Sequence, residues 1–340
     1  MTLLVSLIIV GISTVTAILI DRFVAKKNIQ NDSKIFNQEK TMIDEEYRYS
    51  VNENKEIIET TSSSNSNSQI EYYKGVKKSI LAFVIYYAFN IGGGLVFQFI
   101  LHPFVLKDLG ITIEQLIETS QYYDEAAYKM YESYLTGYLN FVVFAVIFVG
   151  LILLYKKSLL QNLKELKAKP FQILKLAGLG FVGMYVANFF VSVIVMLFFG
   201  DDFVSTNQNS LIDLFNAGGD IRILLVIFTV IFAPIVEELL FRKSLFNFFK
   251  KDSGVAIIVS ALIFAGIHVI SPTFSALLGW ISNANEFSLV FKELLYIIVY
   301  LAPAFVLSFV YSMSEKNLLP CILMHMAQNL LSVIVMFLDL

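Results

Sequence analysis

The most constraining feature of this sequence is a series of long apolar runs. Several stretches exceed ~18 residues with one charged residue or none, which is enough for a helix to cross ~30 Å of hydrocarbon. A soluble core helix does not need this length, and strands of an outer-membrane barrel would alternate apolar and polar residues over ~10 positions. We therefore predict an all-α fold, that of a polytopic helical membrane protein.

The composition excludes several other classes of protein. Of the 340 residues, 57% are hydrophobic and 16% charged, whereas soluble domains average roughly 45–50% apolar and ~25% charged residues. This hydrophobicity also excludes a disordered chain. Cys321 is the single cysteine, so the protein is not a secreted disulfide scaffold. The net charge of −3 offers no basic surface for nucleic acid.

Eight membrane spans are predicted, and the charges between them indicate their orientation. The spans are approximately residues 2–20, 79–101, 133–155, 171–199, 221–249, 254–270, 289–313 and 318–338. Lysines and arginines gather in alternate loops, and aspartates and glutamates in the others. Because basic loops stay cytoplasmic, we expect both termini to be external, in a multi-pass protein of the cell membrane.

The polarity of the chain divides it into three parts. Residues 1–20 are predicted to form an N-terminal membrane anchor, and residues 21–73 a flexible cytoplasmic linker with a Ser- and Asn-rich centre at 60–68. Residues 74–340 form the helical membrane domain. The sequence has no glycine-rich phosphate loop, so it encodes no ATP-hydrolysing domain of that kind.

Ionisable groups inside the predicted spans mark the functional site. A charge at the bilayer centre costs ~2.5–3.5 kcal/mol, so it persists where something requires it. At ~1.5 Å of rise per residue, three clusters on separate helices reach similar depths, and we expect them to face one cavity. The clustered residues are Glu237, Glu238 and Arg242, then His268, then His325 and Asn329.

The spacing within each helix suggests a division of roles. Glu238 and Arg242 are four residues apart, so they share a helix face and can pair. Glu237 lies ~100° round the helix without an obvious cation, which makes it the better candidate for a base that takes a proton from water. Pro234 removes a backbone donor three residues earlier and opens the carbonyl ladder beside the site.

The histidine clusters suit the remaining steps of amide hydrolysis. His325 and Asn329 are also four residues apart, so both can donate hydrogen bonds to a developing oxyanion. His268 comes from a separate helix, where it could orient the water or protonate the leaving amine.

The three clusters, in this order, resemble the CPBP family of CAAX-processing and bacteriocin-processing intramembrane proteases, also called the Abi family. The family's motifs are Glu-Glu-x-x-x-Arg, Phe-x-x-x-His and His-x-x-x-Asn or Asp, with Phe264 opening the second one here. The resemblance covers roughly residues 171–338, a protease core similar to type II CAAX prenyl endopeptidase. It implies a hydrolase in which Glu237 and His268 activate water while His325 and Asn329 form the oxyanion hole.

The cofactor and the function each have an open alternative. Glu237, His268 and His325 could together hold zinc, as in a metalloprotease; the absence of a His-Glu-x-x-His motif favours a metal-free mechanism with no cofactor. The expected partner is a membrane-associated or lipidated peptide, of CAAX or bacteriocin-precursor type. The alternatives are a non-catalytic membrane scaffold or bacteriocin immunity protein, and a proton-coupled transporter, which the missing inverted repeats disfavour.

Overall fold

The computed structural model describes residues 54–122, 125–200, 205–249, 253–282 and 287–338, and every regular element in these ranges is a helix. The elements before the middle of the chain are α2 (Asn54–Tyr87), η1 (Ala88–Gly93), α3 (Gly94–Leu109), α4 (Ile113–Tyr122), α5 (Glu125–Ala168) and α6 (Pro170–Phe199). Those after it are α7 (Thr206–Asn216), α8 (Gly219–Ile227), η2 (Phe228–Phe232), α9 (Ala233–Glu237), η3 (Glu238–Ser244), α10 (Ser253–Ser282), α11 (Phe287–Leu295), α12 (Ile297–Met313) and α13 (Leu319–Phe337). The three η elements are π-helical segments.

Seven helical stretches in the described ranges are long and apolar enough to cross a membrane. They correspond to the second through eighth predicted spans, so the all-α membrane fold is confirmed and the chain is an integral membrane protein. The predicted first span, residues 2–20, lies outside the described residues. The sixth span is longer than predicted, because α10 continues past Pro272 to Ser282.

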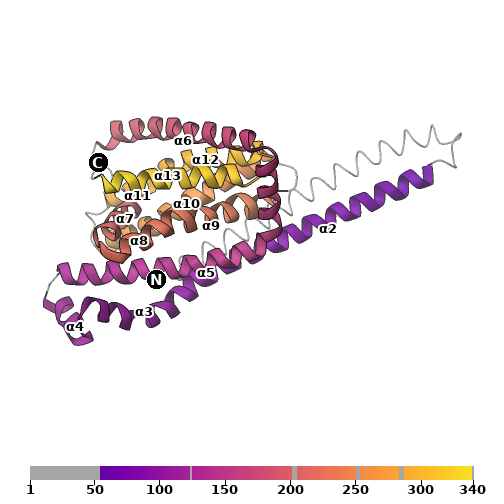
Figure 1. The fold of residues 1–340 in the computed structure, drawn as a ribbon. Helices are drawn as coiled ribbons and strands as arrows, with labels where there is room; N and C mark the ends of the chain where they lie inside the picture. Colours follow the sequence, from indigo (N-terminus) through magenta and orange to yellow (C-terminus); the bar gives the residue numbers. More distant parts are fainter. Residues whose placement is uncertain (1–53, 123–124, 201–204, 250–252, 283–286, 339–340) are drawn as a thin grey trace.

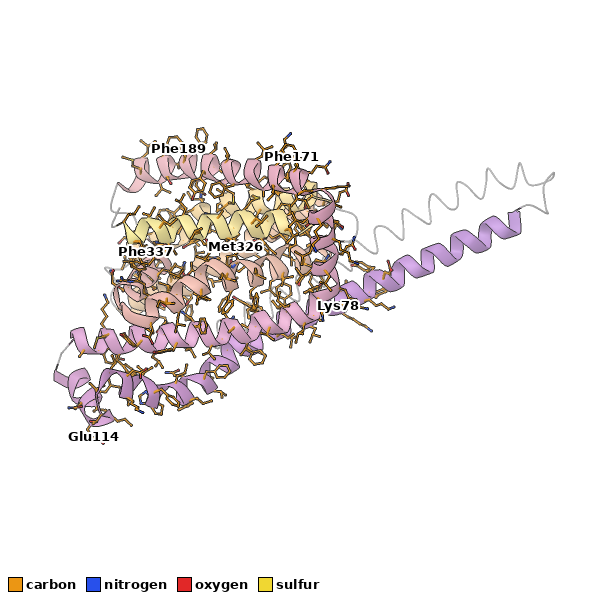
Figure 2. All side chains as sticks on the ribbon, viewed as in Figure 1. Lys78, Glu114, Phe171, Phe189, Met326 and Phe337 are labelled. Atoms are coloured by element: carbon orange, nitrogen blue, oxygen red, sulfur yellow. The ribbon has the colours of Figure 1, made fainter. Side chains whose placement is uncertain are left out.

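The helices form a layered bundle (Figure 1). Helix α6 covers α12 and α13 on one side, α10 packs against α12, and α3 lies along α5 on the opposite side. Lys78 and Glu114 lie at opposite ends of the bundle in Figure 2, and Phe337 near the C-terminus lies at the end that carries Glu114. This agrees with the predicted alternation of basic and acidic ends.

One boundary differs from the sequence prediction. Helix α2 begins at Asn54, so residues 54–73, predicted as part of a flexible linker, are helical where the structure describes them. No glycine or proline occurs between residues 54 and 73, so nothing interrupts the backbone hydrogen bonds that extend the helix from the span. The rest of the predicted linker lies outside the described residues.

The centre of the bundle is the stretch from α8 to η3, which alternates between α- and π-helical turns. The side chains of Leu239, Leu240 and Phe241 are at most 1% exposed, and the ring of Phe241 packs against Phe83 of α2 and Phe264 of α10. Each π-helical turn adds one residue to a helical turn, and such turns are frequent at functional sites. This buried stretch carries the first predicted cluster.

Candidate active site

The predicted pair of Glu238 and Arg242 is present and fully enclosed. Arg242 Nη1 donates to Glu238 Oε1 over 3.1 Å, and both side chains are 0% exposed. Arg242 Nη2 also donates to the carbonyl oxygen of Ala304 on α12 at 3.2 Å, and the guanidinium lies 4.6 Å from the centre of the Phe264 ring. The buried cation therefore has a carboxylate, a carbonyl and an aromatic face as partners.

Serine hydroxyls hold the π-helical segment η3 in place. Ser244 Oγ donates to the carbonyl oxygen of Leu239 at 2.8 Å, and Ser260 Oγ of α10 donates to that of Phe241 at 2.6 Å. Ser308 of α12 in turn donates to Ser260 at 3.2 Å. These bonds give partners to carbonyl groups buried away from water and fix the helix of Glu238 against α10 and α12.

Glu238 has a second partner that the sequence did not reveal. The Nδ1 atom of His325 lies 2.9 Å from Glu238 Oε1, and because a carboxylate accepts, Nδ1 carries the hydrogen and donates. This bond fixes the tautomer and the orientation of the imidazole, as a carboxylate does in a catalytic triad. Glu238 is therefore the link between Arg242 and His325.

Glu237, unlike Glu238, has no arginine partner among the described residues. Its Oε2 atom lies 3.6 Å from Nε2 of His325, the ring nitrogen opposite the one bound to Glu238. The residue is 9% exposed. Among the described residues, Glu237 thus faces an imidazole rather than a permanent cation.

Asn329 already has one hydrogen-bond partner in the structure. Its Nδ2 donates to the carbonyl oxygen of Thr229 at 2.8 Å, so one amide hydrogen is already engaged. The reason lies in η2, where the Ala233 N–H donates to the carbonyl oxygen of Phe228, five residues earlier. The residue five positions after Thr229 is Pro234, which has no N–H to donate. Asn329 supplies the missing donor to Thr229, and its second amide hydrogen is the one that an oxyanion could accept.

His268 lies in an aromatic setting on α10. Its Nδ1 donates to the carbonyl oxygen of Phe264 at 2.9 Å, which leaves Nε2 as the nitrogen that can accept a proton in the neutral ring. The Phe264 ring contacts both imidazoles, with centroids 4.8 Å from His268 and 5.9 Å from His325. In the described part of the chain, no hydrogen bond joins His268 to Glu237 or His325, so Phe264 lies between the two histidines as a shared contact.

The residues considered for zinc do not form a ligand cluster. Within the described ranges, no three His, Cys, Asp or Glu side chains lie close enough together to hold a metal ion. Glu237, His268 and His325, as they are arranged, therefore form no such cluster.

Two contacts that shape this site gave no signal in the sequence. Tyr300 is an ordinary aromatic residue of an apolar span, and its contact with His268 crosses between helices. The Glu238–His325 bond joins residues 87 positions apart. The one signal in the sequence was Pro234. Because it lacks a backbone N–H, it indicated that a carbonyl near the polar cluster needed another donor.

Comparison with known proteins agrees with the motifs. Residues 219–331 match the family described as "type II CAAX prenyl endopeptidase Rce1-like", and all residues of the three clusters fall within this segment. An uncharacterized protein of Mycoplasma capricolum subsp. capricolum is 29% identical over 203 residues, which is 56% of this chain and 53% of the relative. The match thus spans about half of that relative's length. No solved structure matches the chain.

Proposed function

We propose that this protein, a member of the CPBP family of CAAX-type intramembrane proteases over residues 219–331, is an endopeptidase that cleaves a membrane-associated or lipidated peptide with water activated by Glu237. The observation that carries the proposal is the inequality of two adjacent carboxylates. Glu238 is matched by Arg242 at 3.1 Å, whereas Glu237 faces Nε2 of His325 at 3.6 Å. A carboxylate free of a permanent cation is the one that can take a proton.

In the proposed first step, Glu237 removes a proton from a water molecule. The water oxygen forms a bond to the carbonyl carbon of the peptide, and the carbonyl oxygen becomes an oxyanion. The second amide hydrogen of Asn329 and an N–H of His325 stabilise that charge. The role of His325 as a donor requires a proton on Nε2, since Nδ1–H is already directed to Glu238.

The second step breaks the peptide bond. As the tetrahedral intermediate collapses, the carbon–nitrogen bond breaks and the leaving nitrogen takes a proton. Glu237 returns the proton it removed, either directly or through Nε2 of His268, so no proton is gained or lost over the cycle. Because the groups are buried, water access is limited, and each electrostatic interaction is stronger than in solvent.

The experiment is cleavage of a fluorogenic farnesylated peptide by the purified full-length chain in proteoliposomes. Glu237→Gln keeps the shape of the side chain but cannot accept the proton of the water molecule. We therefore expect kcat to fall by at least ~10²-fold, which is the usual contribution of a general base to the rate. The melting temperature should stay close to that of the wild type. Asp213→Asn, which alters an exposed ion pair with Lys129 at a distance from the site, is the matched control and should cleave normally. Full activity of Glu237→Gln would refute the proposed base, and a wild type that cleaves no lipidated peptide while binding one would favour the scaffold.

A further inference from the structure

Tyr300 of α12 lies flat against the imidazole of His268. The two rings are 4.6 Å apart at an angle of 23° between their planes, which is a stacked arrangement. The Phe264 ring is 4.8 Å from the same imidazole, and the Phe264 carbonyl accepts its Nδ1 hydrogen. His268 is therefore restrained by two aromatic rings and one hydrogen bond.

The hydroxyl of Tyr300 is itself anchored, by the first turn of α7. Asn207 Nδ2 donates to the Tyr300 hydroxyl at 3.2 Å, and a second bond of 3.1 Å joins it to Ser205 Oγ. Ser205 is the N-cap of α7, where its Oγ accepts from the backbone N–H of Gln208 at 3.1 Å. The ring position thus depends on three connected polar groups and not on apolar packing alone.

The same turn of α7 is fastened to α11 as well. Thr206 Oγ1 donates to Glu293 Oε1, and Glu293 is 7% exposed. The start of α7 is therefore bound through neighbouring residues to both α11 and α12. A turn held at two points is a firm support for Tyr300.

These contacts matter because an imidazole can change both its orientation and its tautomer. A ring flip puts Cδ2 in the place of Nδ1 and Cε1 in the place of Nε2, and a tautomer change moves the hydrogen from one nitrogen to the other, so a histidine that transfers protons needs both to be fixed. The bond to Phe264 sets the tautomer only while the ring keeps its plane, and stacking against Tyr300 maintains that plane.

We propose that Tyr300, held by Ser205 and Asn207 of α7, is a positioning residue for His268: it keeps Nδ1 on the Phe264 carbonyl and Nε2 as the nitrogen available for a proton. The catalytic meaning of this inference rests on the proposed function. The geometric claim does not, and it can be tested on the protein without any substrate.

The direct test is ¹⁵N NMR of the full-length chain, labelled at histidine and reconstituted in nanodiscs. The chain has three histidines, and single His→Gln variants assign their signals. We expect His268 of the wild type to give one neutral form with the hydrogen on Nδ1. Tyr300→Leu, which removes the ring, should give a mixture of both tautomers, whereas Tyr300→Phe, which keeps the ring, should preserve Nδ1–H with broader lines.

A matched control exists at His102. Its Nδ1 is hydrogen-bonded to the hydroxyl of Tyr131, and the two rings are 5.6 Å apart. Tyr131→Leu should change the signals of His102 and leave those of His268 unaltered, and Tyr300→Leu should do the reverse. If the signals of His268 are the same in Tyr300→Leu and the wild type, the inference is overturned, whatever the activity. If Tyr300→Leu does not fold, Asn207→Leu and Tyr300→Phe decide instead, and sharp, unshifted His268 lines in both overturn it.

Activity then separates this inference from the proposed function. With the farnesylated peptide, Tyr300→Leu should lower kcat by about 10- to 100-fold, because a small misplacement of a reacting group costs that much, and should change KM by less than about two-fold. A wild type without peptidase activity would defeat the proposed function and leave the NMR result standing. An active Tyr300→Leu with wild-type kcat, despite a disturbed tautomer, would show that His268 does not need to be positioned, and would overturn the role assigned to Tyr300.

Discussion

Replacing Glu238 should damage the fold and the chemistry separately, and a second substitution can tell the two effects apart. Glu238 Oε1 accepts from Arg242 at 3.1 Å and from His325 at 2.9 Å, and the side chains of Glu238 and Arg242 are 0% exposed. Glu238→Leu removes both bonds and leaves a buried guanidinium without its counter-ion. Breaking a buried pair in this way costs about 3–5 kcal/mol of unfolding free energy.

The double variant Glu238→Leu/Arg242→Met removes both charges at once. Replacing a buried ion pair by apolar residues of similar volume is often neutral for stability, so most of the loss should be recovered. The activity should not return, because His325 still lacks the carboxylate that fixes its tautomer. Loss of the corresponding carboxylate in a serine-protease triad lowers kcat by roughly 10⁴-fold, so we expect a loss of at least ~10³-fold here.

Cys321 makes the stability assay straightforward. It is the single cysteine of the chain, and it is 0% exposed, so a thiol-reactive dye reports its exposure on heating in detergent. At about 2–4 °C per kcal/mol, the figure for proteins of roughly 150–250 residues, Glu238→Leu should melt at most about 6–20 °C below the wild type and the double variant within a few degrees of it.

Two outcomes would refute this reasoning. Asp213→Asn disrupts an ion pair whose side chains are 62% and 44% exposed, which is expected to be worth under about 1 kcal/mol. If Glu238→Leu melts no lower than this control, the buried pair does not support the fold. If the stable double variant cleaves at the wild-type rate, Glu238 does not orient His325.

Two further predictions test the neighbouring contacts. Asn329→Ala leaves the Thr229 carbonyl without its donor, which should lower the unfolding free energy by about 1–3 kcal/mol. Adding Pro234→Ala restores a backbone N–H five residues after Thr229 and should raise the melting temperature of Asn329→Ala. If the melting temperature does not recover, Asn329 does not replace the donor that Pro234 lacks. Incubation of the purified wild type with a strong chelator, followed by dialysis, should leave peptide cleavage unchanged, because Glu237, His268 and His325 form no ligand cluster; loss of activity restored by stoichiometric zinc would show that the zinc alternative is correct.

The parts of this structure that depend on local geometry were predictable from the sequence. Seven spans follow from hydropathy, and the Glu238–Arg242 pair follows from a spacing of four residues on one helix. Both inferences need only the rise and the turn of a helix. The helical start of α2 at Asn54 was not foreseen, because a polar composition describes solvation and not backbone hydrogen bonding.

Contacts between helices were not predictable in the same way. His325 bonds to Glu238, Asn329 to Thr229, and His268 stacks on Tyr300, and in each case the partner is on another helix. Depth counting placed these residues at comparable levels but could not give their rotation about each helix axis. The π-helical turns of η2 and η3 change that rotation by a residue each, so the partner of Asn329 depends on a register that no period in the sequence shows.

The pairing of Arg242 with Glu238 also determines where charge moves during the proposed reaction. With Arg242 matched to Glu238, Glu237 is the carboxylate whose negative charge moves in the proposed reaction. When a proton passes from water to Glu237 and the hydroxide adds to the peptide, that negative charge reappears on the carbonyl oxygen, so the charge is relocated and its total is unchanged. In a buried site of low dielectric constant this matters, because creating a charge is far more costly there than moving one over a few ångströms. If Arg242 faced Glu237 instead, the cation would hold the carboxylate in its ionised form and weaken it as a base. The two glutamates are therefore not interchangeable: Glu237→Gln should remove the chemistry alone, and Glu238→Gln should impair both the chemistry and the fold.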